Sequence, residues 1–385
     1  MIPPETEWLS DANLRAVCDA LRAAGDDVYL VGGCVRDAIL GIPGSDVDMA
    51  TPLSPAEVTR LAEAAGLKVV PTGIAHGTVT VVAGGTGYEV TTFRKDVATD
   101  GRRAVVAFST DMAEDARRRD FTLNALYATP EGRILDPLGG LEDCLSRRIR
   151  FVGTARDRIR EDYLRILRFF RFHAWYADSS RGFDEDALDA IAAHAEGLET
   201  LSAERVGQEM RRLLAAPDPA PALATMQRTG VLQRLLPGSD ITLLGPALHI
   251  EAHLAMTQDW RMRLAALGGL DVAERLRLSS KDAQHLTVLR EAMSEGPPVS
   301  EIAYRSGYDL AAQTLVLRSA LANHLPDPSA LGPLKTAAQA QFPIRAKDFM
   351  PGLSGKALGA RLAALEERWI ASDFTLTREE LMTPD

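Results

Sequence analysis

Residues 28–48 read VYLVGGCVRDAILGIPGSDVD. The apolar run at its start predicts a buried strand that ends in two glycines. Gly32 and Gly33 let the backbone come close to a phosphate chain, because neither residue has a Cβ in the way. Arg36 follows in the next turn, and a guanidinium can fork onto phosphate oxygens. The stretch therefore predicts an α/β unit with a phosphate-binding turn.

Two carboxylates, Asp46 and Asp48, close the same stretch one residue apart. Residues i and i+2 of a strand point to the same face, so we expect both to aim at one spot. Aligned carboxylates repel each other unless a cation sits between them, and Mg²⁺ carried by a triphosphate is the natural occupant. Glu89 lies on a later predicted strand as a third candidate carboxylate; a solvent-facing strand glutamate is the equal alternative. These residues together indicate nucleotidyl transfer.

The composition is that of a globular protein. Of its residues, 46% are hydrophobic and 25% charged, which excludes disorder. A length of 385 residues is too great for one ordinary core, so we expect two or more domains. The formal net charge of −10 argues against broad, non-specific nucleic-acid binding. Residues 145–171 nevertheless hold nine arginines against three acids, a basic stripe that suits a partner lying along a defined track.

Several classes of protein are disfavoured by what the sequence lacks. The three cysteines form no CxxC pair, so we expect a reducing compartment and no four-cysteine zinc site. The first residues have no signal-peptide pattern and no apolar run reaches about 18 residues, so we expect a cytoplasmic protein without a membrane span. No P-loop, GxGxxG or HD dipeptide supports a kinase, a Rossmann enzyme or an HD-type phosphohydrolase.

Strand signals end near residue 150, and helical patterns follow. We predict an α+β protein, in which a mixed-sheet part of about 140 residues is followed by a helical part. Residues 95–104, polar and without periodicity, predict a mobile surface loop. The predicted strands are 28–31, 47–50, 68–70, 78–83 and 88–92, with a hairpin turn at 84–87. The predicted helices include one capped by Ser10 or Asp11 and those at 54–65, 157–177, 185–194, 203–215 and 220–236.

Three arginines, Arg117 to Arg119, precede an apolar segment that begins with two good helix-start residues, Asp120 and Thr122. This arrangement predicts arginines beside a helix N-terminus, which favours anions. A solvated charged face is the simpler alternative. We select Arg119 as a contact to a triphosphate or ribose.

The predicted helix 157–177 carries Asp162, Arg165 and Arg168 at i, i+3 and i+6, and Arg171 extends the row. A salt-bridged amphipathic helix is the simpler interpretation. In the functional interpretation, Asp162 and Arg165 offer an acceptor and a donor to a base edge, and Arg168 and Arg171 face phosphates.

Seven segments in this order resemble the class II tRNA nucleotidyltransferase and bacterial poly(A) polymerase family of the polymerase β superfamily. They are GGCVRD, DVD, EVTTFR, RRRDFTLNAL, DPLGGLEDC, EDYLRILRFFRF and AERVGQEMRRLL. The resemblance implies a small mixed-sheet catalytic head, residues 1–143, then an all-helical neck, 144–215, and an all-helical body and tail, 216–385. It also implies the transfer of CMP and AMP from CTP and ATP onto a tRNA 3′ end with release of pyrophosphate. It does not separate full CCA addition from C-only, A-only or poly(A) addition, although residues 72–78 favour CCA addition. An RNA-binding protein with an inactive head is the non-enzyme alternative, and a monomer is expected.

The resemblance also implies roles for single residues. Gly33 and Arg36 would hold the triphosphate, and Asp46 and Asp48 would bind Mg²⁺. The remaining implied roles are nucleotide contact for Arg119, pairing with the incoming base for Asp162 and Arg165, assistance in the pocket for Arg168 and Arg171, a flexible loop for residues 95–103, and support of the base-reading helix for Glu204 and Arg205.

Overall fold

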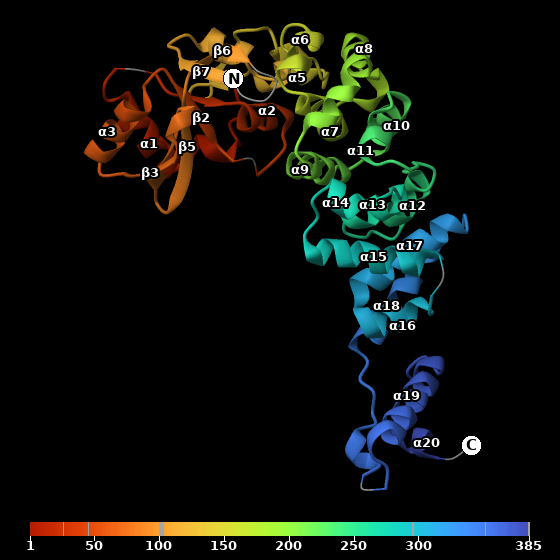
Figure 1. Ribbon diagram of the computed structural model, residues 1–385. Coiled ribbons are helices and arrows are strands. Elements are labelled where there is room, and N and C mark those ends of the chain that lie inside the picture. The colour runs from red at the N-terminus through yellow and green to blue at the C-terminus, as the bar shows by residue number, and fades with distance from the viewer. Residues whose placement is uncertain (26, 45, 100–103, 295, 351, 384–385) are drawn as a thin grey trace. The chain divides into compact units, whose positions relative to one another are not determined.

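The computed structural model describes residues 1–25, 27–44, 46–99, 104–294, 296–350 and 352–383 (Figure 1). The chain divides into two compact units, Met1–Leu235 and Leu236–Asp385. The predicted boundaries near residues 143 and 215 both fall inside the first unit, so the division into head, neck, and body with tail stays a prediction.

Strands of the first unit form a mixed sheet, as predicted. Among the described residues it has seven strands in the order β3-β4-β5-β2-β1-β8-β9. β2 and β5 run parallel, and the other neighbouring pairs run antiparallel. The glycine turn at 84–85 joins β4 to β5, which confirms the predicted hairpin. The strands are β1 (Tyr29–Val31), β2 (Asp48–Thr51), β3 (Lys68–Gly73), β4 (Thr78–Ala83), β5 (Thr86–Thr92), β8 (Tyr127–Ala128) and β9 (Ile134–Leu135).

Two capped helices, α1 (Ala12–Arg22) and α3 (Pro55–Ala64), pack against β4 of this sheet (Figure 1). Asp11 caps α1 by accepting a hydrogen bond from the Asn13 amide at 2.9 Å. Ser54 and Glu57 form a complete capping box at the start of α3. Both caps were predicted from the sequence, because each satisfies amides that have no partner in the first helical turn.

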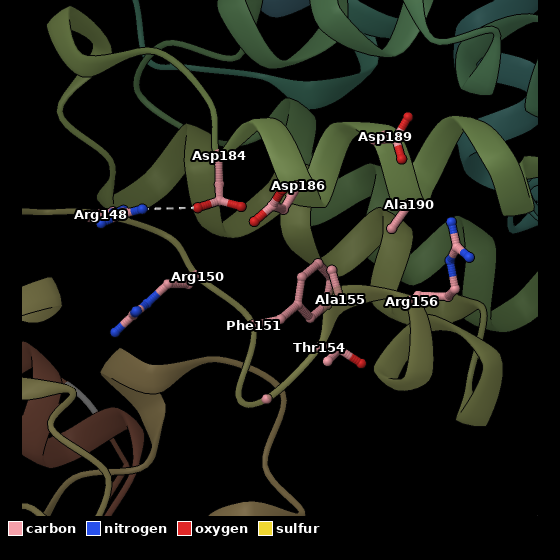
Figure 2. Close-up of a pocket in the computed structure, with 11 residues that line it drawn as sticks. Arg148, Arg150, Phe151, Thr154, Ala155, Arg156, Asp184, Asp186, Asp189 and Ala190 are labelled. Atoms are coloured by element: carbon pink, nitrogen blue, oxygen red, sulfur yellow. Dashed lines mark hydrogen bonds and ion pairs between the residues drawn. The ribbon is translucent and has the colours of Figure 1, made fainter.

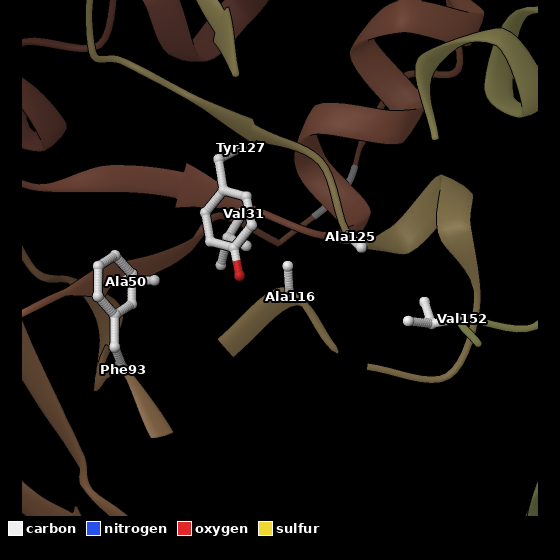
Figure 3. Packing of buried hydrophobic residues seen from close by; sticks show 7 residues of the cluster. All are labelled: Val31, Ala50, Phe93, Ala116, Ala125, Tyr127 and Val152. Atoms are coloured by element: carbon white, nitrogen blue, oxygen red, sulfur yellow. The ribbon is translucent and has the colours of Figure 1, made fainter. Parts of the chain in front are cut away.

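A small apolar cluster packs the end of α4 (Met112–Arg117) against strands β1, β2 and β8 (Figure 3). Tyr127 of β8 is fully buried in it, and its ring meets Phe93 edge-on at 6.2 Å. The other members are Val31, Ala50, Ala116, Ala125 and Val152. The cluster therefore holds Ala116, and the arginines that follow it, close to β1 and β2.

The helical remainder of the first unit differs from prediction in two places. Residues 157–177 form two helices, α6 (Ala155–Glu161) and α7 (Leu164–Tyr176), because Asp162 has extended backbone with φ −157°. Residues 220–236 likewise divide into α10 (Ala220–Arg228) and α11 (Val231–Leu235) at Thr229 and Gly230. The remaining helices of the first unit are α2 (Gly33–Leu40), α5 (Leu141–Leu145), α8 (Glu185–His194) and α9 (Ala203–Leu214). Its 3-10 turns are Glu7–Leu9, Ile74–His76, Thr122–Asn124, Ser179–Arg181 and Ala195–Thr200.

Two further predictions about the head are wrong. The predicted mobile loop at 95–104 lies largely in a two-stranded antiparallel ribbon, β6 (Arg94–Thr99) and β7 (Ala104–Phe108). Residues 100–103 of that prediction lie outside the described residues. The predicted helix after Asp120 is only the 3-10 turn Thr122–Asn124, so Arg119 does not stand beside a helix N-terminus.

The second unit is helical, as predicted. No helix in the described ranges is long and apolar enough to cross a membrane. Its helices are α12 (Leu244–His253), α13 (Trp260–Leu267), α14 (Val272–Arg275), α15 (Ser280–Ser294), α16 (Val299–Ser306), α17 (Tyr308–Leu321), α18 (Leu331–Gln339), α19 (Gly355–Ala371) and α20 (Arg378–Met382), with 3-10 turns at Pro328–Ala330 and Ala346–Asp348.

Candidate functional site

The glycine pair forms the turn between β1 and α2. Gly32 has φ 72°, in the left-handed region that favours glycine, and its amide donates to the Leu126 carbonyl at 3.0 Å. A Cβ on Gly32 would lie 3.2 Å from Nη1 of Arg119. The absence of a side chain at Gly32 therefore lets Arg119 approach the turn closely.

Three carboxylates lie around the start of β2. Asp48 is the first residue of the strand and stands in register with Glu89 on the parallel strand β5, so the two side chains share a face. Asp46 precedes the strand, so the predicted i, i+2 strand geometry does not apply to it. Partial burial, then the charges of Glu89 and Asp46, raise the pKa of Asp48, whereas the Arg119 guanidinium lowers it. The structure thus brings these four predicted residues within electrostatic reach of one another.

This carboxylate pair fits a divalent cation. Carboxylate oxygens are the ligands that Mg²⁺ prefers, and Mg²⁺ commonly takes one or two of them and completes its shell with water and substrate phosphates. The repulsion that raises the pKa of Asp48 is the kind that a bound cation relieves. Within the described part of the chain, no group of three or more His, Cys, Asp or Glu residues is arranged to hold a metal ion. Asp46 and Asp48 carry oxygens of the kind that such an ion binds, and their role as its ligands stays a prediction.

Arg119 is fixed by a buried acid that the sequence analysis missed. Its Nη2 donates to Oδ2 of Asp115 at 3.0 Å, and the Tyr127 hydroxyl donates to the same oxygen at 2.7 Å. Asp115 also binds Arg118 and its side chain is 1% exposed. Burial raises the pKa of Asp115, but the Arg119 and Arg118 guanidiniums prevail and hold it at about 2. The i, i+3 and i, i+4 spacing from Asp115 to the two arginines was the available signal.

Arg36 faces the interior of the unit. Its guanidinium donates to both carboxylate oxygens of Asp37, at 2.7 and 2.9 Å, and to Oδ1 of Asn124 at 2.5 Å. It also donates to the Tyr176 hydroxyl at 2.8 Å, and the residue is only 5% exposed. To bind phosphate oxygens with its guanidinium, Arg36 would have to give up these hydrogen bonds. In this structure it links α2 to Asn124 and to the end of α7.

Asp162 stands between α6 and α7, not on a helix with Arg165. Its Oδ1 accepts a hydrogen bond from the Leu164 amide at 3.1 Å, which gives the first amide of α7 a partner. Its Oδ2 accepts from Nη2 of Arg205 on α9 at 2.5 Å. The predicted face made of Asp162, Arg165 and Arg168 is therefore wrong as helix geometry, although Asp162 still lies at the start of the arginine-bearing helix.

The three arginines of α7 are paired with acids. Arg165 donates to Glu161 at 2.5 Å, Arg168 lies 2.5 Å from Oδ2 of Asp120, and Arg171 donates to Glu209 at 2.6 Å. Asp120 and Glu209 were missed as partners, although both lie in quoted motifs. These pairs agree with the simpler, salt-bridged interpretation of the helix, and they leave Arg168 the most exposed of the three, at 30%.

The segment Arg118–Asp120 connects the two halves of the candidate site. Arg158 of α6 donates to the carbonyl of Arg119 at 2.8 Å. Arg165 reaches the Arg118 carbonyl at 3.4 Å, and Arg168 binds Asp120 as described. The predicted nucleotide residues of the head and of α7 are thus joined through one short stretch of backbone.

A cavity of about 480 Å³ opens elsewhere, between residues 148–156 and α8 (Figure 2). Arginines line one wall and aspartates of α8 the other, and Arg148 binds Asp184 across it at 3.1 Å. None of the predicted site residues lines this cavity. The candidate site lies on central strands of the sheet, where β1 ends at the glycine turn and β2 begins.

Known proteins resemble this chain over nearly its whole length. The Poly A polymerase head domain matches residues 28–150, and the domain described as "Probable RNA and SrmB- binding site of polymerase A" matches residues 182–242. The chain is 45% identical over 222 residues to the CCA-adding enzyme of Geobacillus thermodenitrificans, an alignment that covers 57% of this chain and 52% of that protein.

Two longer matches cover most of both partners. The solved structure of the Bacillus stearothermophilus CCA-adding enzyme in complex with CTP is 30% identical, with a TM-score of 0.76 over 97% of this chain and 94% of that one. The mitochondrial CCA tRNA nucleotidyltransferase 1 of Mus musculus is 31% identical over 411 residues, 99% of this chain and 91% of that protein. With its head domain, its mixed sheet and this extent of similarity, the chain belongs to the family of CCA-adding tRNA nucleotidyltransferases.

Proposed function

We propose that this protein is a nucleotidyltransferase that adds C and A nucleotides to the 3′ end of tRNA, from CTP and ATP and without a template, to build CCA. The observation that carries the proposal is the group formed by Asp46, Asp48, Arg119 and the Gly32 turn, in a chain of this family. Two carboxylates, an anchored guanidinium and a glycine turn are parts that suit nucleotidyl transfer from a nucleoside triphosphate, because they supply positioning and charge.

We propose Mg²⁺ as the cofactor, held by Asp46 and Asp48. In this two-metal reaction, one bound ion would lower the pKa of the RNA 3′-hydroxyl and position it, and the other would neutralise charge on the departing pyrophosphate. The 3′-hydroxyl gives its proton to water, and its oxygen forms a bond to the α-phosphorus of the triphosphate. The bond from that phosphorus to the oxygen shared with the β-phosphate breaks, and pyrophosphate leaves. Gly32 and Gly33 admit the triphosphate, and Arg119, held by Asp115, offers it a positive charge. Glu89 adds negative charge beside Asp48 as a supporting carboxylate.

We propose that Asp162 and Arg165 select the base. Cytosine and adenine both carry an exocyclic amino group, where uracil and guanine carry a carbonyl oxygen. A carboxylate at that position accepts from C and A and is left unpaired by U and G. Asp162 and Arg165 are paired within the protein, with Arg205 and Glu161, so reading a base requires exchange of these partners. Arg168 and Arg171 would support the pocket through Asp120 and Glu209.

One assay tests the activity and separates its alternatives. The substrate is a tRNA that ends at the residue before CCA, incubated with CTP alone, ATP alone, or both. We expect two C residues with CTP alone, and a single CCA end with both nucleotides. A long A tail with ATP would instead indicate poly(A) polymerase, and addition of one nucleotide type alone would indicate a partial enzyme. No addition under any condition would contradict the proposal.

We also propose the cytoplasm as the compartment in which the protein acts. Cys18, Cys34 and Cys144 are buried free thiols, which agrees with a reducing environment. The monomeric state stays a prediction.

A further inference from the structure

The last residue of α7, Tyr176, contacts Arg36 in two ways. Its ring lies 3.9 Å from the Arg36 guanidinium carbon, measured to the ring centroid. Its hydroxyl accepts a hydrogen bond from Nη2 of Arg36 at 2.8 Å. A cation over an aromatic face and a charge-assisted hydrogen bond reinforce each other at this single contact.

Arg36 is in turn tied to the glycine turn. It lies in the first turn of α2, where its amide donates to the Gly32 carbonyl at 3.0 Å. Its Nη1 donates to Asn124, whose own carbonyl would lie 3.7 Å from a Cβ on Gly32. Because Arg36 is 5% exposed, these contacts are shielded from water, which strengthens them.

The opposite end of α7 carries Arg165, which we propose reads the base. Tyr176 lies eleven residues further along the same helix, a rise of about 16 Å at 1.5 Å per residue. A helix of 13 residues moves as one body, so a contact at its last residue restrains the position of its first turn. Tyr176 is therefore placed to set the distance between the base-reading end of α7 and the turn that admits the triphosphate.

We infer that Tyr176 is a positioning residue for nucleotide selection, acting through Arg36 to hold α7 in register with the Gly32–Gly33 turn. The inference rests on the proposed function and deepens it. Tyr176 does not touch the nucleotide; it keeps the base-reading groups at the distance that a correctly held triphosphate requires. Without Tyr176, the end of α7 loses its contact with Arg36, and we expect a wrong base to be rejected less strictly.

The test measures kcat and KM for single-nucleotide addition of CMP and UMP to a tRNA that lacks CCA. Tyr176→Leu removes the ring and the hydroxyl, and we expect its CTP-to-UTP ratio of kcat/KM to fall on the order of tenfold. Tyr176→Phe keeps the ring over Arg36, so we expect a fall of about threefold, a partial rescue. Trp175→Phe is the matched control: Trp175 lies beside Tyr176, and its Nε1 donates to the Arg212 carbonyl of α9 at 2.7 Å.

The outcomes separate this inference from the proposed function. A ratio that falls in both Tyr176 variants and not in Trp175→Phe supports it. If the unaltered protein is active but Tyr176→Leu lowers the CTP-to-UTP ratio no more than Trp175→Phe does, the inference is overturned and the proposed function stands. If the unaltered protein adds no nucleotide, the proposed function fails and takes this inference with it. Should Tyr176→Leu not fold, an unchanged ratio in Tyr176→Phe still overturns the inference.

Discussion

The negative charge of Asp48 is unfavourable in the protein alone but would be stabilised by a bound cation. Partial burial and the nearby carboxylates of Glu89 and Asp46 raise its pKa. We expect Asp48→Asn to reduce nucleotide addition on the order of a thousandfold, because a ligand and its charge are lost. We expect the melting temperature to stay the same or rise, because like-charge repulsion is removed. Asp19→Asn, an exposed acid on α1, is the control; equal activity of Asp48→Asn and Asp19→Asn would contradict the metal role.

Asp115 has the opposite character, since its charge stabilises the fold. Its pKa, about 2 in the folded protein, lies below the ordinary 3.8, so the ionised carboxylate stabilises the fold above about pH 4. This contribution is lost as the pH falls from about 4 through 2. We expect Asp115→Asn to lower the free energy of unfolding by roughly 2 kcal/mol at pH 7, and the difference to disappear near pH 2. Urea unfolding of both proteins at several pH values measures it; a difference that does not change with pH would contradict the assignment.

The residues that the sequence revealed are those whose chemistry needs no partner. A glycine pair after a strand and two acids one residue apart can be recognised from local sequence. The structure places Gly32 and Asp48 close to Arg119. Arg36 and Arg168 were both assigned to the nucleotide, yet each has partners that only folding brings close. Arg36 binds Asn124 and Tyr176 besides its neighbour Asp37, and Arg168 binds Asp120. Ion pairs over 48 residues of sequence, such as Arg168 with Asp120, have no local signature.

At the scale of elements, the predicted helices failed where a side chain competes with the backbone. The apolar pattern of residues 157–177 continues through Asp162 without interruption, so periodicity predicts one helix. The Asp162 carboxylate instead accepts hydrogen bonds from the Leu164 amide and the Arg205 guanidinium. Asp162 has an extended backbone here, and a new helix begins at Leu164. The capped helices α1 and α3 were predicted correctly because their start signals are local.

This break makes Asp162 and Arg205 a coupled pair, which a double-mutant cycle can measure. We expect Asp162→Ala to lower the CTP-to-UTP ratio and to destabilise the protein by about 1 kcal/mol, since the first amide of α7 loses its partner. We expect Arg205→Ala to lower the ratio less, because the carboxylate remains but is no longer oriented. The double variant should match Asp162→Ala alone, since Arg205 acts through Asp162. Additive losses in single-nucleotide addition would show two independent roles, and unchanged selectivity in Asp162→Ala would reject base reading.

For the whole molecule, the charge balance determines which RNA is bound. A protein with a net charge of −10 repels a phosphate backbone unless the contact is confined to a matching surface. We therefore expect a structured tRNA to be extended far more efficiently than an unstructured RNA with the same last nucleotides. We also expect its KM to rise on the order of tenfold to a hundredfold between 50 and 200 mM salt, as a few phosphate contacts are screened. Steady-state addition to both RNAs, at the two salt concentrations, measures this. Equal use of the two RNAs at low salt, with AMP as the only nucleotide added, would contradict recognition of tRNA shape and favour a poly(A) polymerase.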